Sequence, residues 1–140
     1  MVFEEELFQK LLKSSKKNTV LVKEAKNLPK KDFKAMVKKN KIAKIGVNLF
    51  KRGCCSLFPL YRLSNEFYRL WLTQIDKFIL QGKVHLYAED ALNEILNHVE
   101  LEPVYFDKEL CREVDNAFDL ETVKQLLLDK HIGRASNNEN

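Results

Sequence analysis

The segment from Leu57 to Leu80 constrains the fold of this chain most strongly, because it is long and mostly apolar. Apolar side chains recur along it at steps of three or four residues, as one face of an α-helix requires. The members of this stripe are Leu60, Leu63, Phe67, Trp71, Ile75 and Phe78. Further apolar residues widen the stripe and leave only a narrow charged strip. We therefore predict one long central helix over residues 57–81.

The rest of the chain shows similar helical spacing, so the predicted fold class is all-α, with six or seven helices packed around the central one. The other predicted helices cover residues 3–15, 30–52 and 88–100, and two more follow capping residues Asp107 and Asp119. The helix over residues 30–52 is expected to be interrupted near Asn40 or at Gly46. Residues 19–28 fit a short helix, although the run Thr19–Val22 also fits a brief strand.

The length of 140 residues matches one domain, and we predict a single helical domain over residues 1–134. His131 and Gly133 are expected to mark the end of the last helix. The polar residues 135–140 are expected to form a disordered tail.

Charge is distributed unevenly along the sequence. Residues 1–52 carry a net charge of +10, whereas residues 53–140 carry −6. Most of the positive charge falls between Lys30 and Arg52, where Asp32 is the only acid. Such a segment can neutralise phosphates and release their counterions, which favours RNA or another polyanion as the partner. The candidate binding residues are Lys30, Lys31, Lys34, Lys38, Lys39, Lys41, Lys44, Lys51 and Arg52.

The sequence offers little for catalysis or metal binding. The three cysteines, Cys54, Cys55 and Cys111, lack the spacing of a zinc site, and the three histidines are scattered, so we expect no metal and no cofactor. Basic neighbours could activate the paired cysteines, but no histidine is near them in sequence, and buried structural thiols are the better interpretation. Phosphate-binding glycine loops are absent from the sequence. We therefore do not expect an enzyme.

The sequence shows neither a secretory signal nor a segment suited to crossing a membrane. The acidic start of the chain, residues 1–6, has no secretory pattern, which predicts an intracellular protein, with nuclear, nucleolar and cytoplasmic locations left open. The apolar segment over residues 57–81 carries charges that would be costly in a bilayer, so no membrane span is expected.

One local pattern resembles a known family. Gly53-Cys54, fourteen intervening positions and then Arg69-Leu70-Trp71 is similar to a stretch in the small helical protein subunit of ribonuclease MRP. This resemblance implies a noncatalytic, RNA-associated role in a ribonucleoprotein, in which the matching residues are structural.

Together these patterns predict an all-α binding subunit that contacts RNA or another polyanion, and other protein subunits, within a larger complex. The alternative is a helical protein-protein adaptor without nucleic-acid contact. The two hypotheses differ in whether the lysines of residues 30–52 form one exposed patch.

Overall fold

The computed structural model describes residues 1–25 and 27–137, and its backbone combines helices with strands. The predicted all-α fold class is therefore wrong. The elements, in order, are β1 (Val2–Phe3), α1 (Glu5–Lys13), β2 (Thr19–Lys23), β3 (Lys34–Lys38), β4 (Lys41–Gly46), β5 (Cys54–Arg62), α2 (Asn65–Leu80), α3 (Ala88–Ile95), β6 (Glu102–Tyr105), β7 (Cys111–Arg112) and α4 (Ala117–Asn137). They form two compact units: Glu5–Lys108, and Met1–Glu4 together with Glu109–Asn140.

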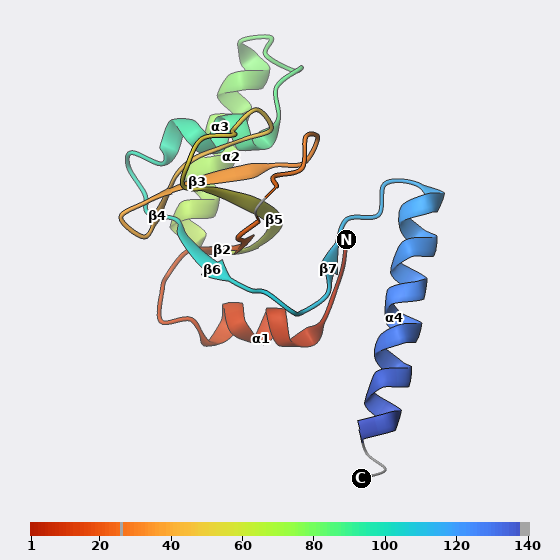
Figure 1. Cartoon of the computed structure of the whole chain (residues 1–140). Coiled ribbons are helices and arrows are strands. Elements are labelled where there is room, and N and C mark those ends of the chain that lie inside the picture. The colour runs from red at the N-terminus through yellow and green to blue at the C-terminus, as the bar shows by residue number, and fades with distance from the viewer. Residues whose placement is uncertain (26, 138–140) are drawn as a thin grey trace. The chain divides into compact units, whose positions relative to one another are not determined.

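The larger unit is built on a five-stranded sheet of strand order β4-β3-β5-β2-β6. Strand β6 runs parallel to β2, and the other neighbours are antiparallel. Helices α2 and α3 lie on one side of this sheet, and α1 lies on the other side, beside β2 and β6 (Figure 1). The core fills the space between the sheet and α2 and α3, with fully buried Val20, Phe67 and Leu92 at its centre.

The predicted central helix is a strand followed by a helix. Residues 54–62 form β5, and α2 begins only at Asn65, because Ser64 caps it by accepting a hydrogen bond from the Phe67 backbone N–H. Proline is tolerated at Pro59 because β5 bulges there: Leu21 pairs with Phe58, and Val20 pairs with Tyr61. Pro59 thus falls where the ladder needs no N–H donor.

The predicted helix over residues 30–52 is also wrong, because most of this segment forms the β3–β4 hairpin. Lys39 and Asn40 have φ values of 48° and 60° and make its tight turn. The register skips Ala43, so Ile42 and Ile45 both point into the core. A bulge therefore places apolar residues three apart on one face of a strand, and this spacing imitates a helix.

Two predicted helices of the larger unit are confirmed as elements, although both are shorter than expected. Helix α1 covers Glu5–Lys13, and α3 covers Ala88–Ile95. Residues 19–23 adopt the strand alternative, β2, and residues Glu102–Tyr105 form the edge strand β6.

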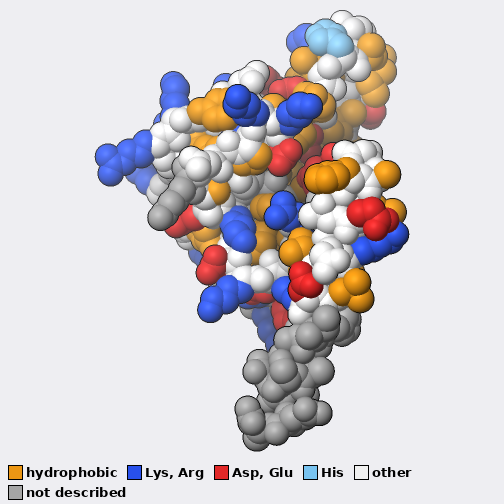
Figure 2. Space-filling view, turned by 45° about the vertical axis from the view of Figure 1, so that its right-hand side comes forward, with side chains coloured by type: hydrophobic (Ala, Val, Ile, Leu, Met, Phe, Trp, Pro, Cys, Tyr) orange, Lys and Arg blue, Asp and Glu red, His pale blue; other side chains and the backbone are white. Residues whose placement is uncertain are grey.

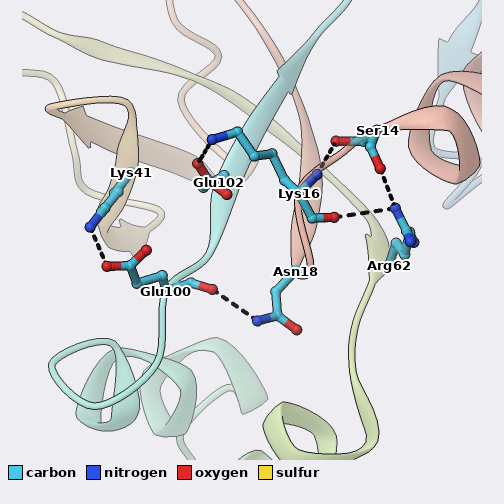
Figure 3. Close-up of polar contacts among 7 residues, drawn as sticks. All are labelled: Ser14, Lys16, Asn18, Lys41, Arg62, Glu100 and Glu102. Atoms are coloured by element: carbon cyan, nitrogen blue, oxygen red, sulfur yellow. Dashed lines mark hydrogen bonds and ion pairs between the residues drawn. The ribbon is translucent and has the colours of Figure 1, made fainter.

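A polar junction holds α1, β2, β5 and β6 together (Figure 3). The Arg62 guanidinium donates to the backbone carbonyls of Leu11, Ser14 and Lys16, where α1 ends. The Asn18 side chain donates to the Glu100 carbonyl and accepts from the Ser64 backbone N–H. These contacts satisfy backbone groups at the end of α1, at the start of α2 and in the neighbouring loops.

The smaller unit pairs β1 with β7 and contains α4. Within it, the Glu4 carboxylate lies 2.6 Å from the Lys130 ammonium and accepts from the Leu110 backbone N–H. A helix following Asp107 is not found, because Cys111–Arg112 is a strand. Helix α4 continues to Asn137, past the expected end at His131 and Gly133, and residues 138–140 of the predicted tail lie outside the described residues. The single domain over residues 1–134 stays a prediction.

Candidate anion-binding hollow

One hollow of the larger unit gathers several of the predicted binding residues. It has a volume of about 580 Å³ and is lined by two segments that are distant in sequence. The residues after β2 are Ala25, Asn27, Leu28 and Lys30, and those at the start of β5 are Phe50, Lys51, Arg52, Gly53 and Cys54. Three of these side chains are cationic, and the described lining residues include no carboxylate. The hollow is therefore suited to an anion.

Lys34 connects the two walls of this hollow from inside the protein. Its side chain is 0% exposed, and its ammonium donates to the backbone carbonyls of Pro29 at 2.5 Å and Asp32 at 2.8 Å. The same ammonium lies 4.5 Å from the centroid of the Phe50 ring, a cation–π contact. Pro29 and Asp32 flank Lys30, and Phe50 precedes Lys51. One buried cation thus positions both cationic walls.

A tight turn presents the other cations. The Cys54 backbone N–H donates to the Lys51 carbonyl at 3.1 Å, and Gly53 between them has φ of +86°. Glycine adopts this left-handed conformation without strain, whereas a larger residue would be strained there. The Gly53 carbonyl in turn accepts from the Val37 backbone N–H at 3.1 Å, which fixes the turn to β3. Lys51 and Arg52 are therefore held on a defined backbone.

The structure separates the remaining predicted binding residues from this hollow. Lys38, Lys39, Lys41 and Lys44 lie on the β3–β4 hairpin with exposed side chains, and Lys31 lies exposed beside Lys30. The Lys41 ammonium pairs with the Glu100 carboxylate, as Figure 3 shows. On the face drawn in Figure 2, basic side chains are interspersed with acidic and hydrophobic ones. Of the nine predicted residues, the hollow brings together Lys30, Lys51 and Arg52.

Lys34 was predicted to be a binding residue, but this prediction is corrected because its side chain is buried. Lysine is rarely buried completely without partners, but two carbonyl acceptors and an aromatic ring here replace water around the ammonium. Lys34 contributes to the hollow by positioning the residues that line it.

Neighbouring Cys54 and Cys55 occupy different environments. Cys54 is half-buried and lines the hollow, whereas Cys55 is buried in the core. Burial raises the pKa of the Cys55 thiol to about 11, so it is protonated and a poor nucleophile at neutral pH.

Among the side chains that the structure describes, those of residues 1–25 and 27–130, no three His, Cys, Asp or Glu are grouped in a way that could hold a metal ion. Among the helices of residues 1–25 and 27–137, none combines the length and the apolar character needed to cross a membrane.

Sequence reasoning found the cations of the hollow but missed Asn27, Leu28, Phe50 and the positioning role of Lys34. A usable signal was present. Pro29 and Gly53 each mark a turn next to a cationic residue, and turns at the ends of strands commonly carry binding groups.

Comparison with known proteins identifies the fold. No protein-family model matches the chain, and no curated protein does. Among solved structures, the inositol-1-phosphate CTP transferase from T. maritima is similar, with a TM-score of 0.58 and 17% sequence identity. The match covers 84% of this chain and 47% of that one, so this chain spans about half the length of the matched structure. The likeness shows a shared fold. Nothing in these comparisons bears on the resemblance to the ribonuclease MRP subunit, which stays a prediction.

Proposed function

We propose that the hollow between Lys30 and the turn Lys51–Cys54 binds the phosphate group of a small phosphorylated molecule. The observation that carries this proposal is the convergence of Lys30, Lys51 and Arg52 on one hollow from two segments. A guanidinium can bind phosphate oxygens through paired hydrogen bonds, and lysine ammoniums add compact positive charge. Leu28 and Phe50 also line the hollow and can contact the apolar part of a ligand.

The shared fold supports the same ligand class. The matched structure is named for inositol 1-phosphate and CTP, and both molecules carry phosphate groups. We therefore propose that the larger unit is the substrate-binding part of a nucleotidyl-transfer enzyme. The described lining residues of the hollow include cations but no carboxylate or imidazole, so we assign binding to the hollow and leave bond formation to other groups.

This proposal narrows the anionic partner expected from the sequence. The name of the matched structure mentions no RNA, so the shared fold gives RNA binding no support. The exposed lysines of the β3–β4 hairpin, which an RNA interface would use, do not line the hollow. The alternative of a protein-protein adaptor stays a prediction.

The proposal can be tested by calorimetric titration of the protein with inositol 1-phosphate, CTP and inorganic phosphate. The variant Lys51→Gln/Arg52→Gln should weaken binding on the order of 100-fold, because two charge-assisted hydrogen bonds are lost. A matched control is Lys38→Gln/Lys39→Gln, which removes the same charge from the exposed hairpin turn. Equal weakening in both variants, or no binding of any of the three ligands, would refute the proposed site.

Cys54 provides a second measurement in the same hollow. Its alkylation by iodoacetamide, followed by mass spectrometry, should slow when a bound ligand fills the hollow. Buried Cys55 serves as the internal control and should stay unmodified with or without ligand. Ligand-independent alkylation of Cys54, under conditions where calorimetry shows saturation, would place the ligand elsewhere.

A further inference from the structure

Helix α2 carries a second apolar stripe that the core does not use. Its inward stripe contains Phe67, Trp71 and Phe78, whereas Tyr68, Leu72, Ile75 and Ile79 lie on the adjoining side. Tyr68 is 51% exposed and Ile79 is 56% exposed. These four residues are spaced by four, three and four positions, which is the repeat of helices that pack along one another. An exposed stripe of this kind marks an interaction site.

The stripe continues into an apolar hollow at the end of α2. This hollow has a volume of about 400 Å³ and lies between α2, the loop that follows it and the start of α3. Its walls include Ile75, Phe78, Ile79, Val84, Leu86 and Tyr87. Figure 2 shows hydrophobic side chains exposed at the top of the molecule, where the connection between α2 and α3 lies in Figure 1.

The charged residues beside the apolar stripe indicate which kind of partner can pack against it. Arg69 and Asp76 are exposed and lie seven residues apart, so they fall on the same flank of the stripe, at opposite ends. If two α2 helices pair in the antiparallel direction, Leu72 meets Ile75 of the other copy, and Arg69 comes opposite Asp76. In a parallel pairing, each charge would instead face the opposite flank of the other helix, which carries the apolar residues Trp71 and Phe78 and offers no opposite charge. The flank is therefore self-complementary in the antiparallel direction only.

We propose that α2 is the interface of a two-fold symmetric homodimer, with the two α2 helices antiparallel. The same register places Tyr68 of one copy opposite Ile79 of the other, beside the apolar hollow. An exposed aromatic side chain entering an apolar pocket is the usual anchor of such an interface. Two-fold symmetry doubles each of these contacts.

The first test is sedimentation equilibrium of the whole protein over micromolar concentrations, comparing two variants of one helix. Leu72 is 41% exposed and lies on the stripe, whereas Leu70 is 39% exposed and points about 200° away. Leu72→Asn should weaken the dimer at least about tenfold, and Leu70→Asn should leave it unchanged. Because the exposures match, both variants should fold equally well. A wild-type monomer at all concentrations, or equal effects of the two variants, would overturn the proposal.

The second test is a charge exchange across the interface. Arg69→Glu should weaken the dimer roughly tenfold, because two attractive pairs become two repulsive ones. Asp76→Arg should weaken it similarly, and the double variant should restore the wild-type dissociation constant. An additive loss in the double variant would exclude the antiparallel pairing, and a dimer insensitive to all three variants would place the interface on another face.

Discussion

The basic segment over residues 30–52 and helix α2 each contain side chains whose exposure differs from the one that the sequence predicts, and they differ in opposite directions. The lysine-rich segment was expected on the surface, yet it contains Lys34, whose side chain is among the largest that are fully buried. Helix α2 was expected to be surrounded by other elements, yet it buries only one stripe, and Tyr68 and Ile79 face solvent. The residue type sets the free energy of burying a side chain, but the surrounding groups decide whether hydrogen bonds and contacts offset that free energy.

The difference shows which partners make burial possible. Lys34 is buried because the loop at residues 29–32 turns its carbonyls inward and Phe50 covers the ammonium. Tyr68 stays exposed because the sheet and α3 reach only the neighbouring stripe, which contains Phe67. The basic segment therefore supplies structure as well as charge, and α2 supplies surface as well as core.

The largest expected effect separates the two sides of α2. Phe67→Ala removes a fully buried aromatic ring and should lower the free energy of unfolding by about 3 to 5 kcal/mol. Tyr68→Ala on the next position should lower it by less than about 1 kcal/mol. Urea unfolding of dilute protein measures both. Equal losses would mean that both stripes are buried, which would also weaken the case for a free surface on α2.

The next effect separates Lys34 from the other lysines. Lys34→Ala should cost about 2 to 4 kcal/mol, because two inward carbonyls lose a charged donor and the side chain leaves a cavity. The exposed Lys38→Ala should cost less than about 0.5 kcal/mol. Thermal and urea unfolding provide the comparison. If Lys34 proves no more costly than Lys38, the positioning role assigned to it would be wrong.

A smaller effect is the loss of stability at alkaline pH that the buried Cys55 thiol, just after the basic segment, should cause. The thiol pKa of Cys55 is raised to about 11 from an ordinary 9.0 because the thiol is buried, so the unfolded state loses its proton first as the pH rises. Stability should therefore be fully present below pH 9 and fall between about pH 9 and 11, by roughly 1 to 3 kcal/mol.

The control for this effect is the neighbouring cysteine. Cys55→Ala should flatten the alkaline loss of stability relative to the wild type, whereas Cys54→Ala should leave the slope unchanged. Denaturant midpoints measured at several alkaline pH values give both slopes. Identical slopes in all three proteins would show that Cys55 is not buried as described.

The helices were predictable where their side chains repeat without interruption. Helix α1 has acids in its first turn and an inward face at Leu7 and Leu11, and this pattern predicts its place from the sequence. Strands β4 and β5 were missed because bulges changed the spacing of their apolar residues. Ala43 has no partner in β3, so Ile42 and Ile45 lie on one face of β4. The bulge at Pro59 interrupts the alternation of side chains along β5, so the end of this strand cannot be recognised from its spacing. A bulge depends on the partner strand, which a linear pattern does not contain.

The candidate site was predictable only in its chemistry. The excess of Lys and Arg between residues 30 and 52 indicated an anionic ligand, but it did not distinguish the cations of the hollow from those of the hairpin. That distinction depends on the turn at Gly53 and on Lys34, which join segments about twenty residues apart.

The sequence by itself determined the local properties of this protein: the helical periods of α1 and α3, the excess of positive charge in residues 1–52, and the scattered positions of the histidines. These follow from side-chain type and spacing along one chain. Only the tertiary structure decided that Lys34 is buried, that Lys30 lies with Lys51 and Arg52 at one hollow, and that one stripe of α2 faces solvent. Those outcomes depend on pairing between distant segments, because a side chain is buried or exposed according to what another part of the chain brings against it.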